Sequence, residues 1–175
     1  MKLKQLLLIA CFFLAPFSFA MAESAEDLYN QAEKEFEEGN RKKALDLLEE
    51  SCKGDHSEAC THLYLFNKDY NRNIRVFDQG CDGGAMSACF WLGYAYEVGS
   101  QGLMRDDAQA AEIYEKACIR RGHLGSCVRL GLLYYDGHGV KKNRAKAFEL
   151  LKRACNAGSG GACDHLRWKF KDGYR

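Results

Sequence analysis

Eight cysteines between residues 52 and 163 recur as four close pairs, and this spacing restricts the folds open to the chain. The two members of a pair lie 8, 8, 9 and 8 residues apart, and the first members of successive pairs lie 29, 37 and 37 residues apart. A period in this range is typical of stacked helical hairpins. The pairs are Cys52 and Cys60, Cys81 and Cys89, Cys118 and Cys127, and Cys155 and Cys163.

Two segments that start at the second cysteine of a pair share a longer motif. Both have the form Cys-x-x-Leu-Gly-x-x-Tyr, running over residues 89–96 and 127–134, and both are followed by a pair of glycines. An apolar stripe at i, i+3, i+4 and i+7 follows each of them, which predicts a second, amphipathic helix. Asp106 and Asn143 stand where this helix needs an N-cap, and Gly122 and Gly158 stand where it should end.

The glycine pattern and the scarcity of proline favour an all-helical chain. Gly93 and Gly131 lie inside predicted helices, where each costs roughly 1 kcal/mol against Ala, so their recurrence predicts that a neighbouring helix passes too close for a side chain. The glycines after Tyr96 and Tyr134 allow the left-handed backbone of a tight turn. The only proline is Pro16, and strand-like alternation is absent from the sequence.

The first 22 residues have the pattern of a secretion signal. Lys2 and Lys4 precede an apolar stretch over residues 6–19, and Ala20-Met21-Ala22 forms a small-x-small cleavage site. We therefore expect a signal peptide at residues 1–22 and a mature chain in the periplasm or secreted. A lipoprotein anchored through Cys11 is a minor alternative, because the apolar run continues past that cysteine.

The charge balance of residues 23–175 excludes bulk attraction to nucleic acid or to anionic lipid. This part of the chain has 23 basic and 24 acidic residues. Its first segment is acidic and its last segment, with Arg167, Lys169, Lys171 and Arg175, is basic. No later apolar run approaches membrane-spanning length, so we expect no membrane span after signal cleavage and no nucleic-acid partner.

The repeated residues resemble the Sel-1-like subfamily of tetratricopeptide repeats, and the cysteine pairs resemble its Helicobacter cysteine-rich branch. The resemblance covers about residues 24–172 and is most specific where Leu-Gly-x-x-Tyr and Lys-Ala-Cys or Arg-Ala-Cys recur. It implies an all-α fold, a right-handed α/α solenoid of two-helix repeats cross-linked by disulfides. The implied single domain, residues 23–175, divides into units at about 24–54, 55–83, 84–121 and 122–158, with a C-terminal capping helix at 159–175.

The first two units depart from this pattern. The first has a plain tetratricopeptide pattern, and Ser24-x-x-Asp27 is a predicted capping box at its start. In the second, Tyr64 replaces the packing glycine and the turn is about seven residues shorter. The packing of the helices in the second unit is therefore left open.

The resemblance also predicts how the cysteines pair. It places one cysteine of each pair at the end of a unit's second helix and the other in the first helix of the next unit. Residues eight apart in one straight helix are about 12 Å apart, too far for a disulfide, but a tight turn brings them together. We therefore expect four structural disulfides, each within one of the close pairs. Zinc sites favour shorter spacings and Cys-x-x-Cys is absent, so we expect no metal, no cofactor and no thiol-redox chemistry.

A row of side chains on the first helices forms a candidate binding surface. In such arrays the first helices line the concave side, which suits a peptide or a partner helix. If Leu92 and Tyr96 face the core, a rotation of 100° per residue puts Trp91 and Tyr94, with Ser87 and Val98, on the opposite side. Aromatic and arginine side chains are typical of interaction hot spots, although packing of Trp91 and Trp168 on neighbouring helices is the alternative. We call the full set the stripe: His62, Leu65, Trp91, Tyr94, Arg129, Leu132, His165 and Trp168.

Two classes of function follow. The repeat architecture predicts an exported scaffold that binds a protein or peptide. The resemblance also implies a β-lactamase or penicillin-binding activity, with peptidoglycan or a β-lactam as ligand. Ser-x-x-Lys and Lys-Thr-Gly are absent, and no clustered histidine and carboxylate set suggests a zinc hydrolase, so we identify no catalytic residues and favour the scaffold.

Overall fold

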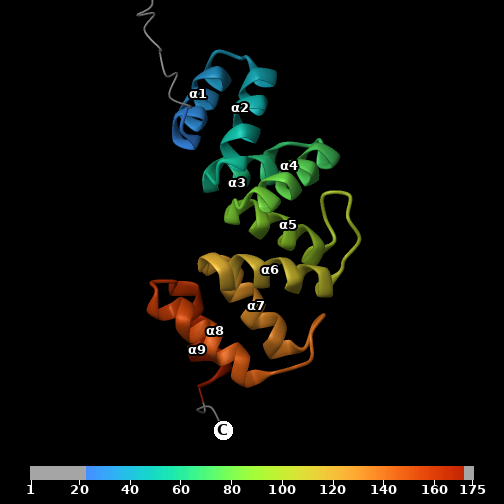
Figure 1. The fold of residues 1–175 in the computed structure, drawn as a ribbon, viewed down its shortest axis with the longest axis vertical. Coiled ribbons are helices and arrows are strands. Elements are labelled where there is room, and N and C mark those ends of the chain that lie inside the picture. The colour runs from blue at the N-terminus through green and yellow to red at the C-terminus, as the bar shows by residue number, and fades with distance from the viewer. Residues whose placement is uncertain (1–22, 172–175) are drawn as a thin grey trace, which may run out of the picture.

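The chain folds into a row of antiparallel helical hairpins. The computed structural model describes residues 23–171, without the side chains of residues 120 and 121, and within them it contains nine α-helices and no strand. The predicted signal peptide, with Cys11, lies outside these residues. Figure 1 shows the hairpins piled from α1 at one end to α9 at the other. The helices are α1 Ala25–Glu37, α2 Arg41–Lys53, α3 Ser57–Phe66, α4 Tyr70–Gly83, α5 Met86–Val98, α6 Asp107–Arg121, α7 Leu124–Asp136, α8 Arg144–Asn156 and α9 Gly160–Lys169.

The predicted helix boundaries are confirmed in the third and fourth hairpins. Asp106 caps α6, since its Oδ1 accepts the backbone N–H groups of Ala108 at 3.0 Å and Gln109 at 2.9 Å. Asn143 caps α8 in the same way. Gly122 ends α6 with φ of +70°, a left-handed conformation that glycine adopts without steric cost. The capping box at the start of α1 also forms, between Ser24 and Asp27.

Both packing glycines face a buried side chain of the partner helix. A Cβ on Gly93 in α5 would lie 2.8 Å from the Tyr114 ring of α6, and one on Gly131 in α7 would lie 3.0 Å from Cγ of Leu151 in α8. Tyr114 and Leu151 are fully buried. The close approach predicted from the recurrence of these glycines is therefore confirmed.

A buried asparagine organises the second hairpin, whose turn is short. Asn73 of α4 is 0% exposed, and its Nδ2 lies within 3.0 Å of the carbonyl oxygens of Leu63 and Asn67 and of Oε1 of Gln101. Asn67 donates back to Oδ1 of Asn73 at 2.7 Å. The α3–α4 connection is thus held to the α5–α6 loop by amide groups, which satisfy one another's hydrogen bonds inside the protein.

Four disulfides join consecutive hairpins, with the pairing that the repeat predicts. Cys52 bonds to Cys60, Cys81 to Cys89, Cys118 to Cys127, and Cys155 to Cys163. Each bridge links the end of a second helix to the first helix of the next hairpin, across Cα–Cα distances of 4.5–4.8 Å. Most of these cysteines are themselves part of the apolar core, which runs the length of the row with Tyr96 packed against both of its halves.

Candidate functional site

Four aromatic side chains from α3 and α5 form a cluster on the first-helix side of the row. We call Tyr64, Phe90, Trp91 and Tyr94 the aromatic cluster. The Tyr64 and Trp91 rings stack with centroids 4.4 Å apart and planes tilted by 24°. Tyr94 meets Trp91 edge-on at 5.8 Å, and Phe90 lies 5.2 Å from Trp91. All four side chains are only partly buried, so part of this cluster is open to solvent.

Arg129 extends the aromatic cluster onto α7. Its guanidinium lies over the Tyr94 ring, 5.2 Å from the centroid, a cation–π arrangement. The same guanidinium binds the Glu97 carboxylate of α5 with two hydrogen bonds, and the hydroxyl of buried Tyr114 donates to Glu97 at 2.8 Å. Burial alone would lower the pKa of Arg129, but the hydrogen bonds and charge of Glu97 outweigh it and the pKa is raised. Arg129 therefore stays charged and fixed beside Tyr94.

The structure brings together only part of the stripe. Trp91, Tyr94 and Arg129 are adjacent, whereas His62 lies towards the α1 end, 5.8 Å from the Tyr29 ring, and Trp168 lies on the last helix. Leu65 and Trp168 are well exposed, and His62, Leu132 and His165 are half-buried. Ser87, expected on the same face as Trp91, is instead buried, and its backbone N–H donates to Asp55 Oδ1 of the preceding connection.

Sequence reasoning missed Tyr64 and Glu97 as members of this region. In the sequence Tyr64 stands out only because it replaces a packing glycine, yet it supplies the ring on which Trp91 stacks. Glu97 has no acidic counterpart in the fourth hairpin, where the matching position is Tyr135. A search for repeated residues could not have found it.

Two histidines, His56 and His123, are N-caps. Nδ1 of His56 accepts the backbone N–H of Ala59 at the start of α3, and Nδ1 of His123 accepts that of Ser126 at the start of α7. His56 also stacks on Tyr29 at 4.4 Å. Burial lowers the pKa of His123, while the nearby Asp55 charge acts in the opposite direction. His123 is therefore a structural group whose neutral form is favoured.

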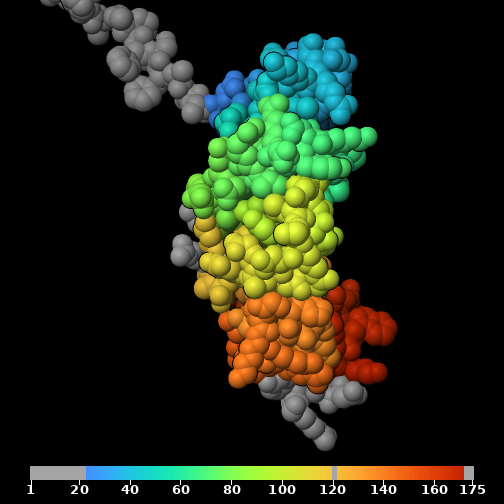
Figure 2. Space-filling view, turned by 90° about the vertical axis from the view of Figure 1, so that its right-hand side faces the viewer, coloured from blue at the N-terminus to red at the C-terminus, as the bar shows by residue number. Residues whose placement is uncertain are grey.

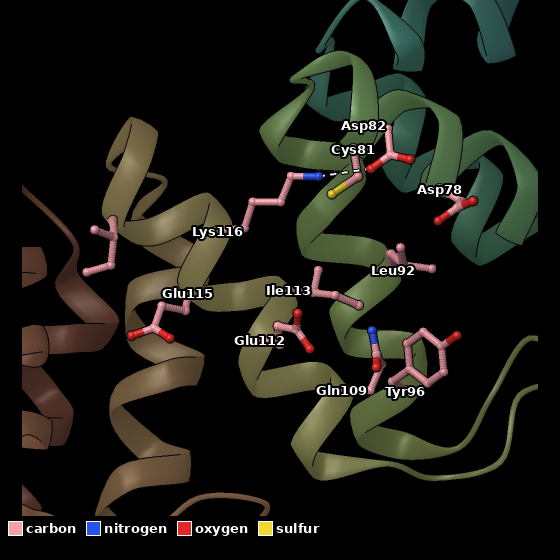
Figure 3. A pocket seen from close by; sticks show the side chains of 11 residues that line it. Asp78, Cys81, Asp82, Leu92, Tyr96, Gln109, Glu112, Ile113, Glu115 and Lys116 are labelled. Atoms are coloured by element: carbon pink, nitrogen blue, oxygen red, sulfur yellow. Dashed lines mark hydrogen bonds and ion pairs between the residues drawn. The ribbon is translucent and has the colours of Figure 1, made fainter.

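A groove that sequence reasoning missed lies between α4, α5 and α6. It is a groove of about 620 Å³ with Leu92 and Ile113 in its wall and carboxylates around it. Figure 3 shows Lys116 reaching across from α6 to Asp82 on α4, and the two groups form an ion pair at 2.9 Å. The groove depends on how three helices are spaced, which no local sequence pattern reports.

Neither a metal site nor a membrane span is apparent in the described part of the chain. Across residues 23–171, no three His, Cys, Asp or Glu side chains are grouped so as to hold a metal ion. None of the helices there has the length and apolar character needed to cross a bilayer.

The chain is similar to proteins of two kinds. It is 36% identical over 126 residues to the mouse protein named cytochrome c oxidase assembly factor 7, covering 66% of this chain and 54% of that one. The Xenopus laevis factor 7A is 37% identical over 78 residues, which is 45% of this chain and 33% of that protein. HcpC of Helicobacter pylori, whose name marks it as a β-lactamase candidate, is 50% identical over 42 residues, 24% of this chain and 14% of that one. The chain thus spans about a third to a half of the assembly factors that it matches.

Solved structures share the fold. Helicobacter pylori cysteine rich protein B superposes with a TM-score of 0.63 at 25% identity, covering 83% of this chain and 98% of that one. A Sel1 repeat protein from Oxalobacter formigenes superposes with a TM-score of 0.65 at 18% identity, covering 83% of this chain and 63% of that one. The predicted right-handed α/α solenoid is confirmed.

Two expectations need correction. The predicted periplasmic or secreted location is contradicted, because the matched assembly factors are proteins of frogs, mouse and human named for cytochrome c oxidase assembly. Paired cysteines indicate oxidised thiols and do not by themselves name a compartment. The alternative ligands, peptidoglycan or a β-lactam, are not supported, since HcpC is matched over only 14% of its length.

The Sel1 repeat matches residues 18–56, 87–120 and 125–159, together more than half of the chain. These segments contain the helical hairpins whose glycine packing and disulfides are described above. The chain belongs to the Sel1 repeat family.

Proposed function

We propose that this protein binds a protein segment along its first-helix face, with the aromatic cluster and Arg129 as the centre of the contact. Sel1 repeats are scaffolds for protein–protein interaction, and an array of stacked hairpins offers an extended surface for that purpose. The observation that carries the proposal is the continuous contact from Tyr64 through Trp91 and Tyr94 to Arg129.

The residue types on this surface are those of a binding surface and not those of an ordinary solvent-exposed helix face. Tryptophan, tyrosine and arginine are the residues enriched in interface hot spots. Here they are held in place before binding, because Trp91 stacks on Tyr64 and Arg129 is fixed by Glu97. Side chains that are already ordered lose less conformational entropy when a partner binds.

The curated relatives fit a binding role. Their name describes assembly of an enzyme complex, a task that requires contact with other proteins. This chain spans only part of their length, so the proposal extends to binding of a protein or peptide and no further. The remaining stripe residues would add contacts on either side: His62 and Leu65 towards α1, and Leu132, His165 and Trp168 towards α9.

The test uses peptides selected for binding from a random peptide library displayed on phage, with the full chain as bait. We expect selected peptides to lose affinity about tenfold or more for the Trp91→Ala/Tyr94→Ala variant, because both rings leave the centre of the contact. Tyr70→Ala is the matched control, since Tyr70 is an exposed aromatic on α4, outside the stripe. Circular dichroism checks that helix content is kept.

The selection can contradict the proposal in two ways. If no peptide is enriched on the wild-type chain, the face does not act as a peptide-binding surface. If the selected peptides bind the double variant and the wild type equally well, the aromatic cluster is not the contact.

A further inference from the structure

The two ends of the solenoid carry opposite charge. Residues 23–38, which contain α1, have seven acidic residues and one basic residue. Residues 141–171, which contain α8 and α9, have nine basic residues and two acidic ones. Figure 2 shows the two regions at opposite ends of the stack, with the first hairpin in blue and α9 in red. Charges separated in this way attract when one molecule meets another head to tail.

An apolar cavity lies in the acidic end. It encloses about 300 Å³ between α1, α2 and α3, and its apolar lining comes from Phe36, Leu45, Leu48 and Phe66. Phe66 is 63% exposed and Leu65 beside it is 58% exposed, so the apolar surface continues outside the cavity. Glu33 lies at the edge on α1, Glu37 follows one turn later, and Arg41 lies on the α2 side. The volume of the cavity suits one aromatic side chain. The acidic residues near it favour a side chain that is carried by a basic segment.

The basic end carries such a side chain. Trp168 on α9 is 75% exposed, and its neighbours in the sequence are Arg167 and Lys169. Large apolar side chains exposed to this degree, with polar residues around them, mark interaction sites. The cavity is lined by α1, α2 and α3, and Trp168 belongs to α9, which lies at the opposite end of the row from α1 in Figure 1. Trp168 can therefore enter this cavity only in another copy.

We propose that the protein self-associates head to tail, with Trp168 of one copy inserted into the α1–α2–α3 cavity of the next. Arg167 and Lys169 would then face Glu33 and Glu37 at the cavity edge. Such an interface joins two different surfaces, so it leaves a free cavity at one end and a free Trp168 at the other, and assembly continues into chains or a ring. The aromatic cluster takes no part in it. Trp168, and His62 in the cavity wall, also belong to the stripe, so the two proposals are separated by variants of Trp91 and Tyr94, which lie at neither surface.

Sedimentation velocity of the full chain over a range of concentrations, at low and at high salt, tests the proposal. We expect concentration-dependent association that weakens as salt rises, since Arg167, Glu33 and Glu37 are exposed and therefore screened. Trp168→Ala should raise the dissociation constant about tenfold or more, as removal of a central anchor does. Met104→Ala is the matched control, because Met104 is 88% exposed in the α5–α6 loop, away from both surfaces; it should associate as the wild type does.

Charge reversal gives a second, independent measurement. The tail variant Arg167→Glu/Lys169→Glu and the head variant Glu33→Lys/Glu37→Lys should each be monomeric alone, because like charges then meet. An equal mixture of the two should associate again. Arg75→Glu/Lys116→Glu changes the net charge by the same amount as the tail variant and lies in α4 and α6, outside both charged ends, so it should associate like the wild type.

Three results would overturn the proposal. The first is a wild-type chain that remains monomeric at every concentration at low salt. The second is a Trp168→Ala variant with an unchanged dissociation constant. The third is a mixture of folded tail and head variants that stays monomeric. The Trp91→Ala/Tyr94→Ala variant should still self-associate, so the loss of peptide binding and the loss of association can be told apart.

Discussion

His56 and His123 act as N-caps through an unprotonated ring nitrogen, an uncommon choice where Ser, Thr, Asp and Asn usually serve. The equivalent position at the start of α9 is Ser159, which accepts the N–H of Ala162. At the start of α5 it is Ala85, which offers no acceptor, and Asp55 of the preceding connection accepts the N–H of Ser87 instead. The first helix of each of these hairpins is therefore capped, but the capping groups differ in how they respond to pH.

We expect His123 to make stability fall in mild acid. Burial lowers its pKa, so the unfolded chain, with an ordinary histidine pKa of about 6.5, binds a proton more readily than the folded chain. The stability due to His123 is complete above that pH and is lost as pH falls from it towards the lowered pKa. Protonation would also remove the Nδ1 acceptor of the α7 cap, worth about 1 kcal/mol.

His123→Asn is the variant that tests this prediction, because asparagine keeps a capping acceptor and does not titrate. Urea unfolding at a series of pH values between 7.5 and 5 should show a smaller loss of unfolding free energy in the variant than in the wild type. Equal losses in the two proteins would show that other groups are responsible.

Helix contact in this fold depends on the absence of a side chain at one position of the first helix. Gly93 lets α5 approach the Tyr114 ring of α6, and Gly131 lets α7 approach Leu151 of α8. Phe90 of the aromatic cluster lies 6.1 Å from the same Tyr114 ring, so the packing of α5 on α6 also sets where Trp91 and Tyr94 project. The second hairpin lacks this glycine and uses the Asn73 amide network instead.

Gly93→Ala should destabilise the protein by about 1–2 kcal/mol, as the clash outweighs the gain in helix propensity. The added Cβ would lie 2.8 Å from the ring of Tyr114, which is fully buried and tied to Glu97 by its hydroxyl. Gly161→Ala in α9 is the control, since a Cβ there meets nothing within 4 Å. Denaturant unfolding should show a lower free energy of unfolding for Gly93→Ala and an undiminished one for Gly161→Ala. An unchanged free energy of unfolding in Gly93→Ala would mean that α5 and α6 can shift apart without cost.

Over the whole molecule, the disulfides connect hairpins that otherwise touch mainly their neighbours. A solenoid of this kind has no single centre, so its stability is close to a sum of hairpins and junctions. Each bridge closes a loop of 8 or 9 residues and contributes about 2 kcal/mol. Four such contributions are comparable to the entire stability of a typical domain.

Reduction of all four disulfides should therefore unfold the chain or lower its unfolding midpoint severely, as measured by circular dichroism with and without a phosphine reductant.

The effect of removing a single disulfide should depend on where that disulfide lies in the row of hairpins. Cys155 and Cys163 are only half-buried and join the last helix alone, whereas Cys81 and Cys89 are buried at the centre. Cys155→Ala/Cys163→Ala should lose less helix content, measured by circular dichroism, than Cys81→Ala/Cys89→Ala. Equal losses of helix content would contradict the view that stability is a sum over hairpins and the junctions between neighbours.

The sequence by itself determined the helical hairpins, the caps of α1, α6 and α8, and the pairing of the cysteines. These features are local: a cap concerns residues two or three apart, and each bridge spans a single turn. The packing glycines were also predictable, because they recur at the same place in two hairpins. When a residue recurs at the same place in two repeats, a single sequence is enough to indicate that the fold requires that residue there.

Only the tertiary structure decided which stripe residues meet, how the second hairpin is held, and where the molecule is hollow. Trp91 stacks on Tyr64, Arg129 binds Glu97, and Asn73 reaches Gln101, each across a gap of more than 25 residues that no periodicity links. The grooves arise where helices diverge, and divergence depends on the sizes of side chains contributed by several helices together. Such contacts are set by packing in three dimensions, so a pattern along the chain does not contain them.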